Sequence, residues 1–357
     1  MNAAAKNYDG VNKYIRITDI DEASSTYTDK NIVSPDGILT DNYLVNNRDI
    51  LLARTGASTG KSYLYKKTDG KLYYAGFLIR ANVTTHDPYF VFSQLHTHRY
   101  WRWVSIMSAR SGQPSINSQE YSSFPIYITS IEEENKIAKL LSLLDERIAT
   151  QNKIIEDLKK LKSAIIEIEY TPNTKTTSHI GDVIEQISKR NKNNAIQNVL
   201  SVSNRQGFIK QSEQFENRNV ASEDTSNYKI VEKNDFAFNP ARINVGSIAR
   251  LTTFENGIVS PMYICFRTQE NVAPEYIDFF FESKHFYCEI QKRLEGSVRQ
   301  CLSFEGLCNI PLSLPSFEMQ QLIGKRLFTL GQKIKTETDL LELLNKQKLY
   351  LLRQMFI

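Results

Sequence analysis

The sequence predicts an α+β protein in which two mixed α/β globules are each followed by a long helix, and the two helices pair as an antiparallel coiled coil. Three observations predict this fold: a repeat at a constant offset of 186 residues, two runs of about 40 residues with a seam of 3.5-residue period, and short strand-like segments between turns. The length of 357 residues and the hydrophobic content of 41% suit two or three globular domains. The composition excludes a collagen-like or wholly disordered chain.

The repeat appears as matched residues that share one spacing. Single matches are weak evidence, but a constant offset maintained over about a hundred positions is strong. We therefore infer a pseudo-twofold repeat of the whole globule and its helix. The matched segments are Asp49–Arg54 with Asp235–Pro240, Gly60 with Gly246, Pro88 with Pro274, and Pro125 with Pro311.

The long helices are the best-matched part of the repeat. Their apolar residues step by 4 and 3, and polar residues interrupt both seams at the same places, Gln151 and Lys162 in the first, Glu337 and Lys348 in the second. This period predicts coiled-coil packing, and 40 residues at 1.5 Å each give a helix about 60 Å long. The alternative is two amphipathic helices that each pack on their own globule. The seam residues are Ile137, Leu141, Leu144, Ile148, Ile155, Leu158 and Ile165, then Ile323, Leu327, Leu330, Ile334, Leu341, Leu344 and Leu351.

The predicted order is globule, helix, linker, globule, helix. The linker is polar and contains a proline, which makes it a natural boundary between the two copies. The expected ranges are a first globule at 1–130, a first long helix at 131–170, the linker at 171–178, a second globule at 179–316 and a second long helix at 317–357.

Within the globules, period-two apolar runs predict strands and aromatic-rich runs that begin near a proline predict helices. Turn signals at 46–49 and 232–235 lead into two of these strands. The predicted strands are Tyr14–Ile17, Leu72–Ile79, Ile230–Val231, Phe236–Phe238 and Met262–Phe266, and the predicted helices are Tyr89–Met107 and Pro274–Leu294.

The segment Gly56–Ser62 resembles a phosphate-binding loop. That motif needs four residues between its glycines, but here there are three, and the matching segment 240–248 has no lysine. An ATP site is therefore the weak interpretation. The preferred one is a loop between two strands that presents Arg54, Thr55, Ser58 and Lys61 outward.

Two polar clusters in each copy are the candidate DNA contacts. Arg and Lys suit guanine edges and phosphates, Asn and Gln can bond two atoms of adenine, and Ser and Thr are adaptable donors. A capping or turn role is the plain alternative for each residue. The candidates are Arg54, Thr55, Ser58, Lys61, Arg110, Ser111, Gln113 and Asn117 in the first copy, and Asn239, Arg242, Asn244, Ser247, Ser297, Arg299 and Gln300 in the second.

No catalytic or metal-binding pattern is evident. His96 and His98 stand close together, but no further ligands follow at a known spacing, and the four cysteines form no C-x-x-C frame. We therefore expect no metal, no bound cofactor and no enzymatic activity in this chain. No apolar run approaches the roughly 20 residues of a membrane span, so a cytoplasmic protein is expected.

In its order of motifs the chain resembles the specificity subunits of type I restriction–modification enzymes. No single motif is decisive, but their order and duplication are specific, and the resemblance covers almost the whole chain. The segments that carry it are Asp49–Gly56, Gly112–Pro125, Ile131–Ala138, Leu158–Lys162 and Tyr350–Phe356.

The resemblance implies that two target-recognition domains each read one half of a bipartite sequence in double-stranded DNA, and that the coiled coil sets the distance between the half-sites. It implies partners too: two methyltransferase subunits, and restriction and translocase subunits. S-adenosylmethionine, ATP and Mg are expected on these partner subunits. The second copy opens with Ile180–Ile184, whose counterpart would precede Met1. This leaves open whether the C-terminal segment completes the first domain by circular pseudo-symmetry.

Two other functions stay open at this point. One is a coiled-coil scaffold that assembles partners without reading DNA. The other is an NTPase that uses Lys61 of the loop at Gly56–Ser62. Methylation of a bipartite motif that depends on this chain would favour the specificity subunit over the scaffold. ATP hydrolysis that depends on Lys61 would support the NTPase.

Overall fold

The computed structural model describes residues 1–109, 112–171, 178–204, 206–214, 224–296 and 300–356. The chain forms two compact units. Unit 1 joins Met1–Ile154 to Glu337–Ile357, and unit 2 is Ile155–Thr336. Each unit therefore contains one globule and a part of both long helices, so the compact units cut across the order of segments along the chain.

The globule of unit 1 has a three-stranded sheet of order β5-β4-β7, with two small strand pairs, β2-β6 and β1-β3. Helices α1 and α2 cover the larger sheet, and α3 leads toward the long helix α4. The strands are β1 Ala4–Asn7, β2 Lys13–Ile15, β3 Val33–Asp36, β4 Asp49–Ala53, β5 Ser62–Leu64, β6 Leu72–Tyr74 and β7 Leu78–Asn82. The helices are α1 Pro88–Gln94, α2 His98–Met107, α3 Ser118–Ser122 and α4 Ile131–Tyr170.

The globule of unit 2 has two four-stranded sheets, β11-β10-β15-β12 and β14-β13-β16-β9, and a strand pair β17-β8. Its strands are β8 Ser178–His179, β9 Ile184–Ile187, β10 Val199–Ser203, β11 Gly207–Lys210, β12 Lys229–Glu232, β13 Phe236–Phe238, β14 Ile248–Arg250, β15 Asn256–Val259, β16 Ile264–Thr268 and β17 Pro311–Leu312. Its helices are α5 Gln211–Gln214, α6 Pro274–Phe280, α7 Lys284–Arg293, α8 Phe304–Cys308 and α9 Phe317–Met355.

The predicted offset of 186 residues is confirmed at the level of single elements. Adding 186 to the bounds of α1, α2 and α3 gives the bounds of α6, α7 and α8. The parallel pair of Lys13 with Leu72 recurs as Val199 with Ile258, in which each residue lies 186 positions later. Both globules therefore share these three helices and this parallel strand pair, although the sheets of unit 2 have more strands, and the predicted α+β pseudo-repeat is correct.

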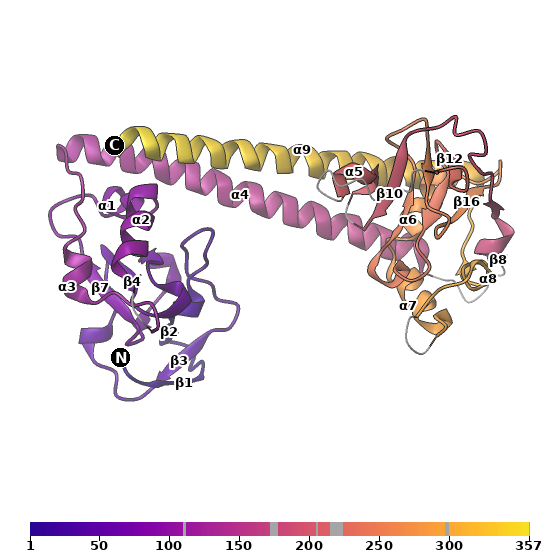
Figure 1. Cartoon of the computed structure of the whole chain (residues 1–357). Helices are drawn as coiled ribbons and strands as arrows, with labels where there is room; N and C mark the ends of the chain where they lie inside the picture. The colour runs from indigo at the N-terminus through magenta and orange to yellow at the C-terminus, as the bar shows by residue number, and fades with distance from the viewer. Residues whose placement is uncertain (110–111, 172–177, 205, 215–223, 297–299, 357) are drawn as a thin grey trace. The chain divides into compact units, whose positions relative to one another are not determined.

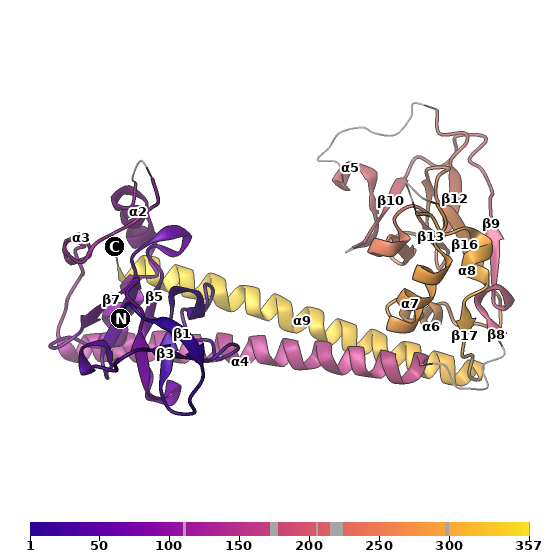
Figure 2. The ribbon, with the colours of Figure 1, turned by 90° about the horizontal axis from the view of Figure 1, so that it is seen from below.

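The two long helices run in opposite directions wherever they pack together. In unit 1, Leu141 and Leu352 belong to one buried cluster, and in unit 2 Ile166 and Ile323 do. Figures 1 and 2 show α4, in pink, beside α9, in yellow, within each unit. All the predicted seam residues are buried or half-buried, from Ile137 to Ile165 on α4 and from Ile323 to Leu351 on α9. The pairing is the expected antiparallel coil.

One short helix in each unit lies between the sheet and the coil (Figure 1). In unit 1 this is α1, whose Phe90 packs on Phe356, with ring centroids 5.2 Å apart. In unit 2 it is α6, whose Tyr276 packs on Tyr170 at 4.8 Å. The C-terminal end of α9 thus packs on α1 in unit 1, as the C-terminal end of α4 packs on α6 in unit 2. The C-terminal segment therefore packs into the first unit, while among the described residues of unit 1 no strand takes the place that β9 has beside β16.

Three predicted elements are divided in the structure. The predicted strand Leu72–Ile79 is β6 and β7, because the chain turns at Ala75–Phe77. The predicted helix Tyr89–Met107 is α1 and α2: the Thr97 hydroxyl donates to Gln94 O at 2.7 Å and accepts from Tyr100 N at 3.2 Å, which ends one helix and caps the next. Ser283 divides the predicted helix Pro274–Leu294 into α6 and α7 in the same way.

Candidate nucleic-acid interface

In unit 1, the two polar clusters are joined by backbone hydrogen bonds. The loop that leaves β4 at Arg54 meets the segment that precedes α3. Gly56 N donates to Pro114 O, and Ile116 N donates to Arg54 O, each at 2.9 Å. Residues almost sixty positions apart in the sequence therefore form one surface. The sequence identified both clusters but gave no sign that they touch.

The β4–β5 loop uses its own amide groups internally. Thr59 N donates to Gly56 O, Gly60 N to Ala53 O and Lys61 N to Ser58 O, at 3.0 Å in each case. A phosphate-binding loop instead directs such N–H groups at the ligand. The geometry of this loop therefore does not favour the ATP interpretation of Gly56–Ser62.

Two buried tyrosines hold the same loop in place. Tyr100 of α2 donates its hydroxyl to Gly60 O at 2.8 Å, and Tyr121 of α3 donates to Ala53 O at 2.6 Å. Burial raises the pKa of Tyr121 to about 12 and that of Tyr100 further, so both hydroxyls remain protonated donors at neutral pH. The loop is a rigid platform built on α2 and α3.

Gly60 is required at its position for two reasons. Its φ of +93° lies in the left-handed region, and a Cβ there would come within 2.7 Å of Val104 and 3.0 Å of Trp101. Helix α2 therefore packs directly on the loop, and a larger residue would separate them.

The predicted contacts of unit 1 differ in how available they are. Arg54, Gln113 and Asn117 are exposed, and Thr55 and Ser58 are half-buried. Asn117 caps α3 by accepting from Glu120 N, and Lys61 pairs with Glu22 at 3.1 Å. Arg54 and Gln113 are thus the most accessible of the set. Arg110 and Ser111 lie outside the described residues.

Unit 2 repeats the junction between its two clusters. Leu302 N donates to Pro240 O at 3.0 Å, which is the counterpart of the bond from Ile116 to Arg54. The side chains around it are different: Phe286 and Leu307 stand where unit 1 has its two tyrosines. The same backbone frame therefore presents different chemistry in each unit.

The predicted contacts of unit 2 divide into exposed and structural residues. Arg242 and Gln300 are exposed, and Asn244 is half-buried. Asn239 and Ser247 are buried. The Asn239 side chain accepts from Ala241 N, and the Ser247 hydroxyl donates to Val202 O at 3.4 Å. These two hold the shape of the loop. Ser297 and Arg299 lie outside the described residues.

The outer face of α2 is a candidate that the sequence did not single out. Trp101 and Ile106 are 44% and 64% exposed, beside the exposed Arg102. At the position of Trp101, α7 has Tyr287, which is also exposed. Two large apolar residues on the polar face of an amphipathic helix were the available signal. Such side chains beside an Arg suit contact with thymine methyl groups and bases.

The polar interruptions of the seam bind one another or nearby charges. Gln151 donates its side-chain amide to the backbone oxygen of Glu337 at 3.0 Å, and these two residues are 186 positions apart. Two interruptions that match at the offset therefore bind each other. Lys348 pairs with Asp145, and its counterpart Lys162 pairs with Glu282, each at 2.6 Å.

The histidine pair has no metal-like surroundings. His96 lies against Phe92, and its burial, reinforced by nearby Lys348, lowers its pKa to about 4, whereas His98 is exposed. Among the described residues, no group of three or more His, Cys, Asp or Glu could hold a metal ion. Within the same part of the chain, no helix has the length and apolarity needed to cross a bilayer.

Comparison with known proteins gives a consistent result. The family model described as the type I restriction modification DNA specificity domain matches twice, over residues 1–160 and 172–346. These two matches correspond to the two copies of the repeat and cover nearly all of the chain.

Individual proteins agree with the family match. The MjaVIII specificity subunit of a type I restriction enzyme from Methanocaldococcus jannaschii is 23% identical over 340 residues, covering 85% of this chain and 77% of that protein. The putative MjaX specificity subunit of the same organism is 25% identical over 298 residues, or 76% and 66% of the two chains. The crystal structure of the type I S subunit from M. genitalium superposes with a TM-score of 0.62 at 16% identity, over 98% and 89% of the chains. This structural likeness supports the fold.

Proposed function

The chain belongs to the family of type I restriction–modification DNA specificity subunits, and we propose that each of its units reads one half of a bipartite DNA target. One observation carries the proposal: the junction between the two polar clusters occurs in both units with the same backbone hydrogen bond and different exposed side chains. A conserved frame with altered reading groups is what two half-sites of different sequence require.

We propose that the coiled coil sets the spacing between the half-sites. Helix α4 has 40 residues and α9 has 39, which corresponds to about 60 Å of helix. Two modules that read one duplex must meet their half-sites at a fixed helical phase, so a spacer of defined length is needed. The bond between Gln151 and Glu337 supports this role, because a polar pair within an apolar seam favours a single register.

The coil also provides surface for partner subunits. Apolar residues that do not face the seam remain exposed on both helices: Leu140, Leu143, Leu161 and Ile168 on α4, and Leu343, Leu349 and Tyr350 on α9. Exposed apolar stripes on a long helix mark interaction sites. We propose that two methyltransferase subunits dock there and that restriction subunits join them. Catalysis, S-adenosylmethionine, ATP and Mg then belong to those partners.

The test is methylation by the assembled complex. The chain is co-expressed with its methyltransferase subunits, and the modified sites in host DNA are read by sequencing. Methylation at one bipartite motif, lost when this chain is deleted, supports the proposal. Assembly of the complex without any sequence preference would instead favour the scaffold without DNA readout.

Single substitutions assign the half-sites to the units. Arg54→Ala should relax base preference in one half-site, and Arg242→Ala should relax it in the other, by about 1–3 kcal/mol if each side chain contacts a base. Each variant is the matched control for the other. A uniform loss of methylation at both half-sites would show that these arginines bind phosphate instead.

A further inference from the structure

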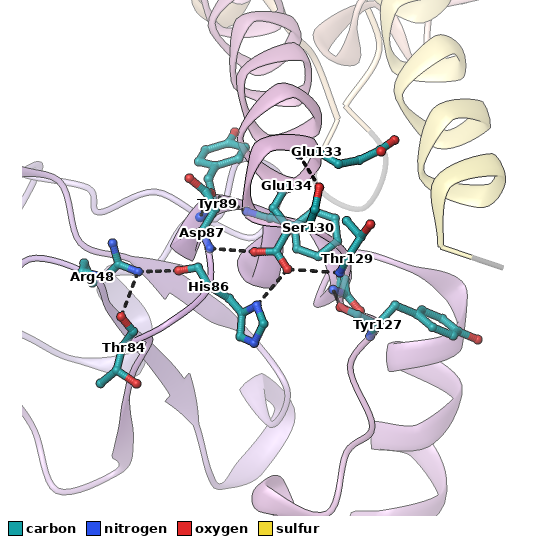
Figure 3. Close-up of polar contacts among 12 residues, drawn as sticks. Arg48, Thr84, His86, Asp87, Tyr89, Tyr127, Thr129, Ser130, Glu133 and Glu134 are labelled. Carbon is teal, nitrogen blue, oxygen red and sulfur yellow. Dashed lines mark hydrogen bonds and ion pairs between the residues drawn. The ribbon is translucent and has the colours of Figure 1, made fainter.

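The joint between α4 and the globule of unit 1 centres on a buried carboxylate. Glu134 lies in the first turn of α4, has no exposed surface, and accepts three hydrogen bonds from the globule side (Figure 3). One oxygen accepts from Asp87 N at 2.9 Å, and the other contacts His86 Nδ1 at 2.8 Å and Thr129 N at 3.3 Å. Asp87 is the N-cap of α1, so this side chain ties the start of α4 to the start of α1.

The surrounding residues complete this joint. Arg48 donates to the backbone oxygen of Val83 and, as Figure 3 shows, to those of Thr84 and His86, which fixes the loop between β7 and α1 that carries His86. Glu134 itself lies where the amide dipoles of α4 favour a negative charge. A carboxylate buried in this way is stabilised by its donors, and the loss of one donor or of the charge is costly.

Unit 2 builds the same joint with a neutral residue. Gln320, 186 positions after Glu134, is 2% exposed and accepts from Ala273 N, the N-cap of α6, at 3.0 Å. Its amide nitrogen then donates to Pro315 O at 2.9 Å. In both units one side-chain oxygen of the long helix thus accepts from the backbone N–H of the N-cap residue of a short helix.

The two joints differ at two partners of this side chain: His86, which contacts Glu134, corresponds to Val272 in unit 2, and a second difference lies five residues upstream. Unit 1 has Thr129 there, whose N–H needs an acceptor, and a carboxylate oxygen provides one. Unit 2 has Pro315 there, which has no N–H and offers only its carbonyl oxygen, so a donor is needed. Each joint residue is matched to its partner: a carboxylate oxygen accepts from the Thr129 N–H, whereas an amide nitrogen donates to the Pro315 carbonyl oxygen.

From this complementarity we infer that Glu134 with Thr129, and Gln320 with Pro315, are matched pairs that fix the orientation of each recognition domain on its long helix. They are positioning residues, not DNA contacts. The inference rests on the proposed function in one respect: the orientation of a domain on the coil sets the spacer length at which its half-site is read. The pairing of the residues stands on the structure alone.

The decisive experiment exchanges one pair for the other. In Glu134→Gln, the new amide N–H groups face the Thr129 N–H, donor against donor. Adding Thr129→Pro removes that N–H, so the new amide can donate to the carbonyl oxygen of residue 129, which is the bond that Gln320 makes to Pro315 in unit 2. His86 can adopt the tautomer that accepts at Nδ1. Glu133→Gln, an exposed neighbour, is the matched control for the loss of charge.

The assembled methyltransferase complex is tested on duplexes whose two half-sites are separated by different spacer lengths. The wild type and Glu133→Gln should methylate one spacer length at least about tenfold better than its neighbours, the factor that corresponds to 1.4 kcal/mol. Glu134→Gln should reduce this preference to a few-fold with unchanged half-site bases, and the double variant should restore it. Unchanged spacing preference in a folded Glu134→Gln complex would overturn the inference, as would failure of the double variant to restore it.

A second measurement is independent of DNA. Hydrogen exchange of the Asp87 amide in the full chain should accelerate by about tenfold or more in Glu134→Gln and return toward the wild-type rate in the double variant. The reciprocal substitutions test unit 2. Gln320→Glu should accelerate hydrogen exchange of the Ala273 amide, and adding Pro315→Thr should return it toward the wild-type rate. If the wild-type complex shows no bipartite methylation, the proposed function fails, but these exchange rates still decide whether the pairs are matched.

Discussion

Unit 2 includes its part of the coiled coil in the core of its globule, whereas unit 1 keeps its part in a separate cluster. Ile166, Tyr170, Ile323 and Leu327 pack in one continuous core with the residues of β13, β16 and α6. In unit 1, Phe90, Leu141, Leu352 and Phe356 form a small cluster apart from the main sheet core. The same elements at the same offset therefore give two different degrees of coupling between globule and coil.

This difference shows which features of a duplicated unit are constrained. The contacts that align globule and coil recur in kind, with Phe90 on Phe356 and Tyr276 on Tyr170. Their chemistry is free to change as long as each buried donor and acceptor remains satisfied. The side chains around the loop junction also differ between the units, as the proposed reading of two half-sites requires.

The largest expected effect comes from removing equivalent leucines from the two clusters. Leu141→Ala and Leu327→Ala should each cost about 2–5 kcal/mol of unfolding free energy, because both side chains are almost fully buried. In unit 2 the loss should accelerate hydrogen exchange across the sheet of β13 and β16. In unit 1 it should accelerate exchange in α1 and the coil but spare β4. Equal exchange effects in both sheets would contradict the difference between the cores.

Low pH should reduce the folding stability of unit 1 through His96, a residue whose counterpart in unit 2 is not a histidine. The pKa of His96 is lowered to about 4 by burial and by Lys348, partly opposed by Asp145, whereas position 282 of unit 2 is a glutamate. Between about pH 6.5 and pH 4 the unfolded chain binds a proton at this histidine that the folded chain does not. Stability from this group is thus complete above pH 6.5 and falls below it, by up to about 3 kcal/mol at pH 4. Denaturant unfolding of His96→Gln should show a shallower acid slope, and an unchanged slope would assign the acid sensitivity to carboxylates.

The charged pairs at the coil should differ between the units. Asp145 pairs with Lys348 and also accepts from the Tyr89 hydroxyl at 2.6 Å, whereas Glu282 has Lys162 and is more exposed. Asp145→Ala should therefore cost about 1–2 kcal/mol and Glu282→Ala less than about 1 kcal/mol in unfolding free energy. A larger cost for Glu282→Ala would reverse this ranking.

The smallest expected effect tests the ring pairs beneath the helix ends. Tyr170 donates its hydroxyl to Tyr276 O at 2.7 Å, so Tyr170→Phe should cost about 1 kcal/mol. Phe356→Tyr places a hydroxyl at the equivalent position, where Phe90 O is the matching acceptor, and should be close to neutral. Thermal unfolding compares the two, and a strongly destabilising Phe356→Tyr would show that the two ring pairs are not equivalent.

Much of this architecture could be predicted from the sequence, because local patterns determine it. The seam period, the shared interruptions at Gln151 and Glu337, and the constant offset all reflect side chains that repeat along one helix. The division of helices at Thr97 and Ser283 was missed, since a capping hydroxyl within an apolar run looks like any other polar residue. The outer face of α2 was missed because Trp101 and Ile106 look like core residues in the sequence.

The sequence by itself determined the repeat, the order of its segments, the antiparallel coil and the candidate reading loops. Only the tertiary structure decided which residues meet: that the loop at Arg54 bonds the segment at Ile116, that the end of α9 completes the contacts of α1, and that Glu134 and Gln320 hold their domains through different partners. The physical reason is range. Periodicity records the environment of neighbouring residues, whereas the partner of a buried polar group is set by how distant segments pack.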